Sequence, residues 1–93
     1  MEKIKVTQKQ IFIGSLLATY EKGATCYDII ENHSEELKKQ GISIEKINSV
    51  NATLASLASK GLVTKEKVAR KDKIVTLYKF TQKLLDLLKE SNN

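Results

Sequence analysis

Apolar side chains recur every three or four residues from position 11 to position 20, which is the spacing of one face of an α-helix. Thr7, followed three residues later by Gln10, has the pattern of a capping box and predicts the start of this helix. Gly23 predicts its end, because glycine readily adopts the left-handed conformation that follows helix C-termini. The apolar face consists of Phe12, Ile13, Leu16, Leu17 and Tyr20.

A second helix is predicted from Thr25 to Gly41. Thr25 can cap its first turn, and the positive end of the helix dipole favours the carboxylate of Asp28. The inner face of this helix would consist of Tyr27, Ile30 and Leu37. We therefore expect the helix to cover one side of a small core.

A third helix is predicted over residues 44–60, with Ser43 or Asn48 as its cap. Its apolar face follows the helical period, and its opposite face is small and polar. Short side chains let a helix approach a nucleic-acid groove closely, and Ser and Asn both donate and accept hydrogen bonds. A helix of moderate propensity that faces water is the alternative. The polar face consists of Glu45, Asn48, Ser49, Ala52, Ser56, Ser59 and Lys60.

After Gly61 the hydrophobic period changes to that of a strand. Residues 62–68 and 74–80 are rich in β-branched side chains and predict the two strands of a hairpin. Ala69 to Lys73 would form a five-residue loop. Because this loop lacks glycine, we predict that it is not a tight primed turn.

Thr81 can cap a last helix, predicted over residues 81–90. Its leucines cover more than half of its circumference, so one flank can pack on the domain and the rest needs another cover. We expect a homodimer contact there; complete burial within one chain is the alternative. The leucines concerned are Leu84, Leu85, Leu87 and Leu88.

The chain has a net charge of +5, and the excess lies in one segment. Residues 1–59 carry as many acidic as basic side chains, whereas residues 60–83 carry eight basic ones against Glu66 and Asp72. A localised basic patch points to a polyanionic partner. Lysines that keep a hairpin soluble and protect its edges are the alternative.

The order helix, helix, helix, hairpin, helix resembles the winged helix-turn-helix transcriptional regulators of the MarR and PadR kinds. The junction of Leu57, Gly61, Leu62 and Val63 is similar to the end of their recognition helix, and residues 25–30 look like the start of the second helix of PadR-type domains. The resemblance implies a mostly α, α+β fold with three helices, a two-stranded β-hairpin wing and a C-terminal helix. It implies one domain over residues 1–93, with a core over about 8–80.

The resemblance also implies binding to double-stranded DNA, with helix 44–60 in the major groove and the wing on the backbone or an adjacent minor groove. The side chains expected near base edges are those of Asn48, Ser49, Ala52, Thr53 and Ser56. Lys46 and Lys60 would meet phosphates, as would the wing residues Lys65, Lys67, Arg70, Lys71 and Lys73. Two features depart from this pattern: Glu45 would repel phosphate, and the outward face lacks arginine, so any specificity would be low or based on DNA shape. The long flanking helices of full MarR proteins are missing too, which puts their ligand pocket in doubt.

Catalytic and metal-binding chemistry is not predicted. One cysteine and one histidine cannot form a standard four-ligand Cys/His zinc site, and no glycine-rich phosphate loop occurs. We therefore predict no enzyme activity, metal site or cofactor. His33 is expected on the surface. Cys26, near a helix start, is either a redox-sensitive thiol or a buried structural one.

The sequence also leads to expectations about the cellular location and the function of the protein. The lone cysteine suits a reducing compartment, and no apolar run approaches the roughly 20 residues that span a bilayer, so a cytoplasmic protein outside the membrane is expected. The function that the sequence favours is that of a small DNA-binding transcriptional regulator. The alternatives are a winged-helix module for protein–protein interaction without specific DNA binding, and an RNA-binding module.

Overall fold

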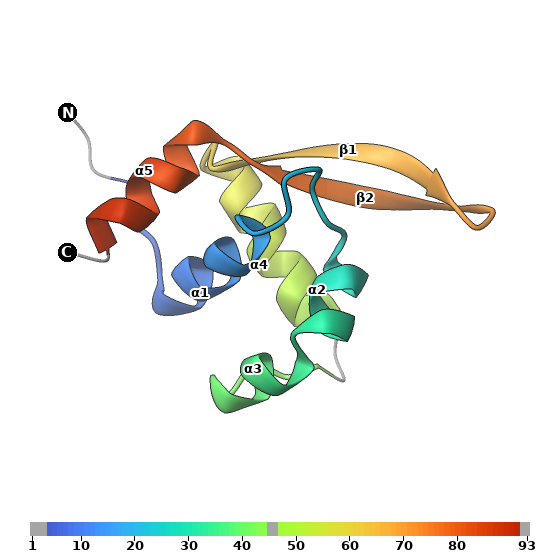
Figure 1. Cartoon of the computed structure of the whole chain (residues 1–93), viewed down its shortest axis with the longest axis horizontal. Coiled ribbons are helices and arrows are strands. Elements are labelled where there is room, and N and C mark those ends of the chain that lie inside the picture. Colours follow the sequence, from blue (N-terminus) through green and yellow to red (C-terminus); the bar gives the residue numbers. More distant parts are fainter. Residues whose placement is uncertain (1–3, 45–46, 92–93) are drawn as a thin grey trace.

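The computed structural model describes residues 4–44 and 47–91, in which helices gather at one end and a hairpin extends beyond them (Figure 1). The last helix lies at the opposite end of the molecule from the hairpin tip (Figure 1). No described helix is long and apolar enough to cross a membrane. The elements are α1 (Gln8–Leu17), α2 (Cys26–Asn32), α3 (Ser34–Lys39), α4 (Ile47–Ser59), β1 (Val63–Arg70), β2 (Lys73–Phe80) and α5 (Gln82–Ser91).

One aliphatic core joins the helices to the base of the hairpin. α4 contributes Val50, Leu54 and Leu57, all fully buried, as its helical period predicts. Full burial of a side chain of this size contributes about 1.5–3 kcal/mol relative to its exposure. The other large side chains that are fully buried are those of Ile13, Leu17, Ile29, Leu37, Leu62 and Leu84. The core therefore lies between α1, α2 and α4.

The start of α1 is as predicted, but the helix is shorter. Thr7 and Gln10 form a complete capping box, with each side chain bonded to the backbone N–H of the other. α1 ends at Leu17, and hydrogen-bonded turns lead from there to Gly23. Gly23 does adopt the left-handed conformation, with φ of 88°, but it closes these turns and not the helix.

The predicted second helix is broken at His33 into α2 and α3. Its start is confirmed, because Thr25 and Asp28 form a second capping box. At His33 the backbone leaves the helical region (φ −129°, ψ 26°). Tyr27 is 59% exposed, so its predicted place on the inner face is wrong.

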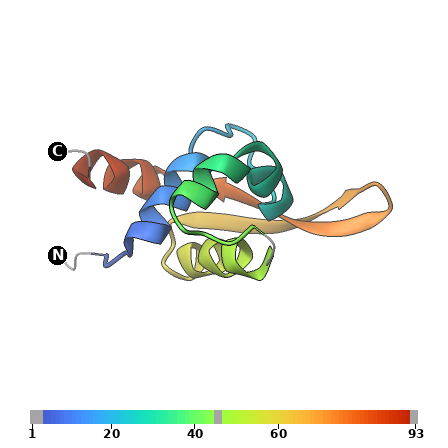
Figure 2. The same ribbon diagram turned by 90° about the horizontal axis from the view of Figure 1, so that it is seen from below.

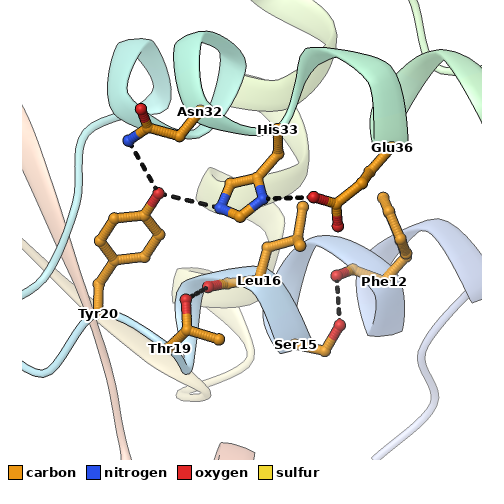
Figure 3. A network of polar contacts seen from close by, with 8 residues as sticks. All are labelled: Phe12, Ser15, Leu16, Thr19, Tyr20, Asn32, His33 and Glu36. Carbon is orange, nitrogen blue, oxygen red and sulfur yellow. Dashed lines mark hydrogen bonds and ion pairs between the residues drawn. The ribbon is translucent and has the colours of Figure 1, made fainter.

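A polar network surrounds this break (Figure 3). Asn32 Nδ2 donates to the Tyr20 hydroxyl at 3.2 Å, and that hydroxyl lies 3.0 Å from His33 Nε2. Glu36 Oε1 lies 3.0 Å from His33 Nδ1. The imidazole is thus held on both sides and its side chain is only 18% exposed, which corrects the expected surface position.

The junction after α4 has the predicted left-handed glycine. Gly61 has φ of 76°, its N–H bonds to the Ala58 carbonyl, and the Leu62 N–H bonds to the Leu57 carbonyl. This pair of bonds is a Schellman motif, which ends the helix and directs Leu62 into the core. Leu62 is fully buried.

The hairpin has longer strands and a tighter turn than predicted. β1 and β2 pair from Val63↔Phe80 to Arg70↔Lys73, which leaves a two-residue turn. Its residues Lys71 and Asp72 have φ of 47° and 64°, the combination that type I′ turns require. The prediction of a five-residue loop without a primed turn is therefore wrong.

Two further contacts fix the base of the hairpin. Ala24 and Tyr78 form an isolated antiparallel bridge, with both backbone hydrogen bonds at 2.8 Å. The Thr81 hydroxyl donates to the Leu62 carbonyl at 2.7 Å and accepts from the Leu84 N–H at 3.3 Å, so it caps α5 as predicted. The first contact joins β2 to the segment before α2, and the second joins the residue before β1 to the start of α5.

Candidate nucleic-acid interface

The start of α1 sets the orientation of α4 about its axis. Gln10 Nε2 donates to Ser56 Oγ at 2.7 Å, and Lys60 Nζ donates to Gln10 Oε1 at 3.0 Å. Two turns earlier along α4, Lys9 Nζ donates to Ser49 Oγ at 2.6 Å. Because positions 49, 56 and 60 lie on one flank of a helix, these bonds hold that flank of α4 against α1.

The predicted base-reading residues fall on different sides of α4. Ala52 is exposed, whereas Ser49 and Ser56 lie on the flank that α1 holds. Thr53 is only 7% exposed, and its hydroxyl donates to the Ser49 carbonyl at 3.0 Å. Its inclusion in the outward face is therefore wrong. Thr53 follows the exposed Ala52 and is turned from it by about 100° around the helix axis, toward the core.

The remaining residues predicted on this helix are placed as follows. Asn48 belongs to the first turn of α4, and Lys46 lies outside the described residues. Lys60, expected to meet phosphate, donates to the backbone carbonyl of Lys5 as well as to Gln10. Its ammonium group therefore has partners within the chain.

The exposed strip of α4 is small and uncharged. It consists of the exposed Ala52 and Ser59 and the half-buried Ala55 between them, which are spaced by three and four residues and so share one face. On the side away from α1 it is bordered by the exposed Asn51, whose Oδ1 accepts a hydrogen bond from the Tyr78 hydroxyl at 3.0 Å. No local sequence pattern marks Asn51, because its partner is 27 residues away.

The register of the hairpin assigns each basic side chain to a face. Side chains of paired residues lie on the same face, and successive side chains alternate. Lys65 pairs with Tyr78 and Lys67 with Thr76, so both lysines share the face of the Tyr78–Asn51 hydrogen bond. In Figure 2, α4 lies along one side of the hairpin and α2 with α3 along the other. Lys65 and Lys67 therefore lie on the α4 side.

The opposite face of the hairpin carries two cations that are paired with carboxylates. Arg70 Nη1 lies 2.9 Å and 3.2 Å from the carboxylate oxygens of Asp28, at the start of α2. Lys79 Nζ lies 3.1 Å from Glu66. Lys73, which pairs with Arg70 in the register, is exposed on this face. Arg70, predicted from the sequence as a DNA contact, is thus occupied by Asp28.

Lys9 is a cation beside α4 that the sequence pattern does not predict. It belongs to α1, outside the basic segment 60–83, and only the tertiary contact with Ser49 brings it there. Among the described residues, no carboxylate forms an ion pair with Lys9, Lys65 or Lys67. The exposed strip of α4 therefore has exposed lysines on both sides.

Cys26 is a buried member of the core, 7% exposed. Burial raises the pKa of its thiol, and the nearby Asp28 carboxylate raises it further, while backbone N–H groups at the start of α2 oppose this. The thiol is therefore protonated at neutral pH, which favours the structural alternative over a redox-sensitive one. Within the described part of the chain, no group of three or more His, Cys, Asp or Glu side chains could hold a metal ion.

The structure matches solved structures of transcriptional regulators. PadR from Bacillus subtilis, solved with operator DNA, matches with a TM-score of 0.74 and 21% identity, over 90% of this chain and 46% of PadR. A PadR-family regulator from Eggerthella lenta matches with a TM-score of 0.65 and 23% identity, over 90% of this chain and 70% of the regulator. ZitR from Lactococcus lactis, a zinc-responsive MarR-family member, matches with a TM-score of 0.65 and 25% identity, over 98% of this chain and 54% of ZitR. The fold is a winged helix.

The match confirms the resemblance expected from the junction after α4. In this winged helix, β1 and β2 form the wing, and the helix before it is the fourth and not the third, because the predicted second helix is broken. The chain spans about half the length of the B. subtilis and L. lactis regulators. No protein-family model matches the sequence, and comparison with curated proteins finds no significant relative.

Proposed function

We propose that this winged helix binds double-stranded DNA as a small transcriptional regulator, with α4 in the major groove and the wing on the sugar–phosphate backbone. One observation carries the proposal: the exposed strip of α4 lies between Lys9 on one side and Lys65 and Lys67 on the other. The similarity to PadR, which was solved with operator DNA, supports it.

The side chains of the strip suit a close approach to DNA. The major groove is about 12 Å wide and admits an α-helix. Residues 47–59 include no charged side chain, so nothing within α4 itself repels phosphate. The strip also lacks arginine, the commonest reader of guanine, so we expect affinity from the flanking lysines and modest discrimination between sequences.

The dependence of affinity on salt tests this proposal. If Lys9, Lys65 and Lys67 each neutralise one phosphate, log K falls with log salt with a slope of roughly −2.7 per protomer, or about 40-fold between about 50 and 200 mM. Fluorescence anisotropy of a labelled duplex, with an RNA duplex of the same sequence as competitor, measures this. Binding that is absent at the lower salt concentration or independent of salt would contradict the proposal. A role of the domain in protein–protein interaction would then be the better interpretation.

We also propose that α5 mediates a homodimer. Leu84 is buried, whereas Leu85, Leu87 and Leu88 are half-buried. Leu87 and Leu88 pack on the core; Leu85 lies outside the core cluster of described residues. A second copy of α5 would cover what remains exposed.

Charge placed on α5 should dissociate this dimer. Leu85→Lys is expected to shift the wild-type dimer toward monomer in sedimentation equilibrium, because an ammonium group would be buried in an apolar contact. Asp86→Lys, at the exposed neighbouring position, is the matched control and should remain dimeric. A wild-type protein that sediments as a monomer would refute the dimer.

A further inference from the structure

Two polar contacts join the wing to the helices, on opposite faces of the hairpin. On one face, the Tyr78 hydroxyl donates to Asn51 of α4. On the other face, near the turn, Arg70 donates to both carboxylate oxygens of Asp28 in α2. The register places Tyr78 with Lys65, and Arg70 with Lys73, so the two contacts hold the hairpin from opposite sides.

The Asp28 carboxylate is fixed independently of Arg70. It accepts the Thr25 N–H at 3.0 Å as part of the capping box that starts α2. Partial burial raises the pKa of Asp28, but the Thr25 N–H and the Arg70 guanidinium outweigh this effect, and the pKa lies below its ordinary value. The carboxylate is thus an ionised anchor at a defined place on α2, and Arg70 is the group that reaches it from the wing.

We propose that Asp28 and Arg70 are positioning residues for DNA binding, because their ion pair, opposed by the Tyr78–Asn51 hydrogen bond, holds the wing so that Lys65 and Lys67 face the same side as α4. This inference rests on the proposed function. It gives Arg70 a role different from the phosphate contact that the sequence suggests. The wing extends beyond the helices (Figure 1), so a small rotation at its base would displace its lysines from the DNA backbone.

The two roles of Arg70 predict opposite effects of removing Asp28. If Arg70 bound phosphate, Asp28 would compete with DNA for the guanidinium, and Asp28→Asn would strengthen binding. If Arg70 positions the wing, Asp28→Asn releases the wing and weakens binding, although it removes a negative charge. Asparagine can still accept the Thr25 N–H, so the substitution preserves the cap of α2.

The test is a double-mutant cycle of Asp28→Asn and Arg70→Gln, measured by DNA-binding anisotropy. Each single variant should weaken binding about three- to fivefold, as expected for a partly exposed ion pair. The double variant should be no weaker than either single one, and the salt slope should stay at its wild-type value. Asp72→Asn makes the same change in the wing turn, where asparagine tolerates the positive φ, and should not weaken binding.

Hydrogen exchange without DNA separates this inference from the proposed function. Backbone amides of residues 66–77 should exchange faster in Asp28→Asn and Arg70→Gln than in the wild type, whether or not the protein binds DNA. Unchanged exchange in both variants would overturn the inference. So would Asp28→Asn binding at least as tightly as the wild type, or Arg70→Gln reducing the salt slope by about 0.9, the value of one lost phosphate contact.

Discussion

Replacing both Lys65 and Lys67 by glutamate is expected to weaken binding to duplex DNA by more than about 100-fold at about 0.1 M salt. Each lost phosphate contact costs roughly eightfold at this salt concentration, and each introduced carboxylate adds repulsion. Both side chains are exposed on the α4 side of the wing, so the fold should tolerate the change. Fluorescence anisotropy gives the affinity, and a thermal melt checks that the variant is folded.

Lys38 and Lys39 provide the control for this prediction. They are exposed in the last turn of α3, away from the strip of α4, and their replacement by glutamate changes the net charge by the same amount. This control should bind within about fivefold of the wild type, because only long-range attraction is lost. Equal losses in the two double variants would mean that net charge, and not the face of the wing, determines binding.

Replacing Gly23 by alanine is expected to destabilise the protein by about 2–5 kcal/mol. Gly23 has φ of 88°, which costs an alanine about 1–2 kcal/mol. A Cβ atom there would also lie 2.7 Å from the carbonyl oxygen of Tyr78 and 2.7 Å from Cγ of Lys79. Relief of this overlap must move backbone at the Ala24–Tyr78 bridge, which adds about 1–3 kcal/mol. Urea denaturation measures the loss.

A Gly41→Ala variant separates the conformational cost of a positive φ from the steric cost of a Cβ atom. Gly41 also has a positive φ, 73°, but a Cβ atom there would meet nothing within 4 Å. Gly41→Ala should therefore lose only the conformational part, about 1–2 kcal/mol. If both variants lost the same free energy of unfolding, the close approach of Gly23 to the hairpin would not contribute to stability.

Features whose partners are near in the chain could be predicted from the sequence. The capping boxes of Thr7 with Gln10 and of Thr25 with Asp28 each involve residues three positions apart, and both are present. The left-handed Gly61 follows from a helical period that ends and a strand period that begins. The buried face of α4 follows from its period alone.

Two local features, the helix break at His33 and the turn of the wing, were predicted wrongly. The helix break at His33 lies beside a contact with Tyr20, which is 13 residues away, and nothing in residues 25–41 signals it. The turn of the wing has Lys71 and Asp72 at positive φ, where the glycine that normally marks such a turn is absent. The local sequence only weakly favours the non-helical backbone at His33 and the positive φ of Lys71 and Asp72.

The candidate interface also combines features that the local sequence predicts with features that depend on tertiary packing. Consecutive residues alone predict that a helix with a small polar face is followed by a basic hairpin, because hydrophobic period and charge are properties of neighbouring positions. Which of these side chains can act together depends on how the elements pack. The hairpin register and the Tyr78–Asn51 contact put Lys65 and Lys67 on the side of α4, whereas Asp28, 42 residues from Arg70, occupies that guanidinium. The approach of Lys9 to Ser49 depends on how α1 packs on α4, which no local pattern encodes.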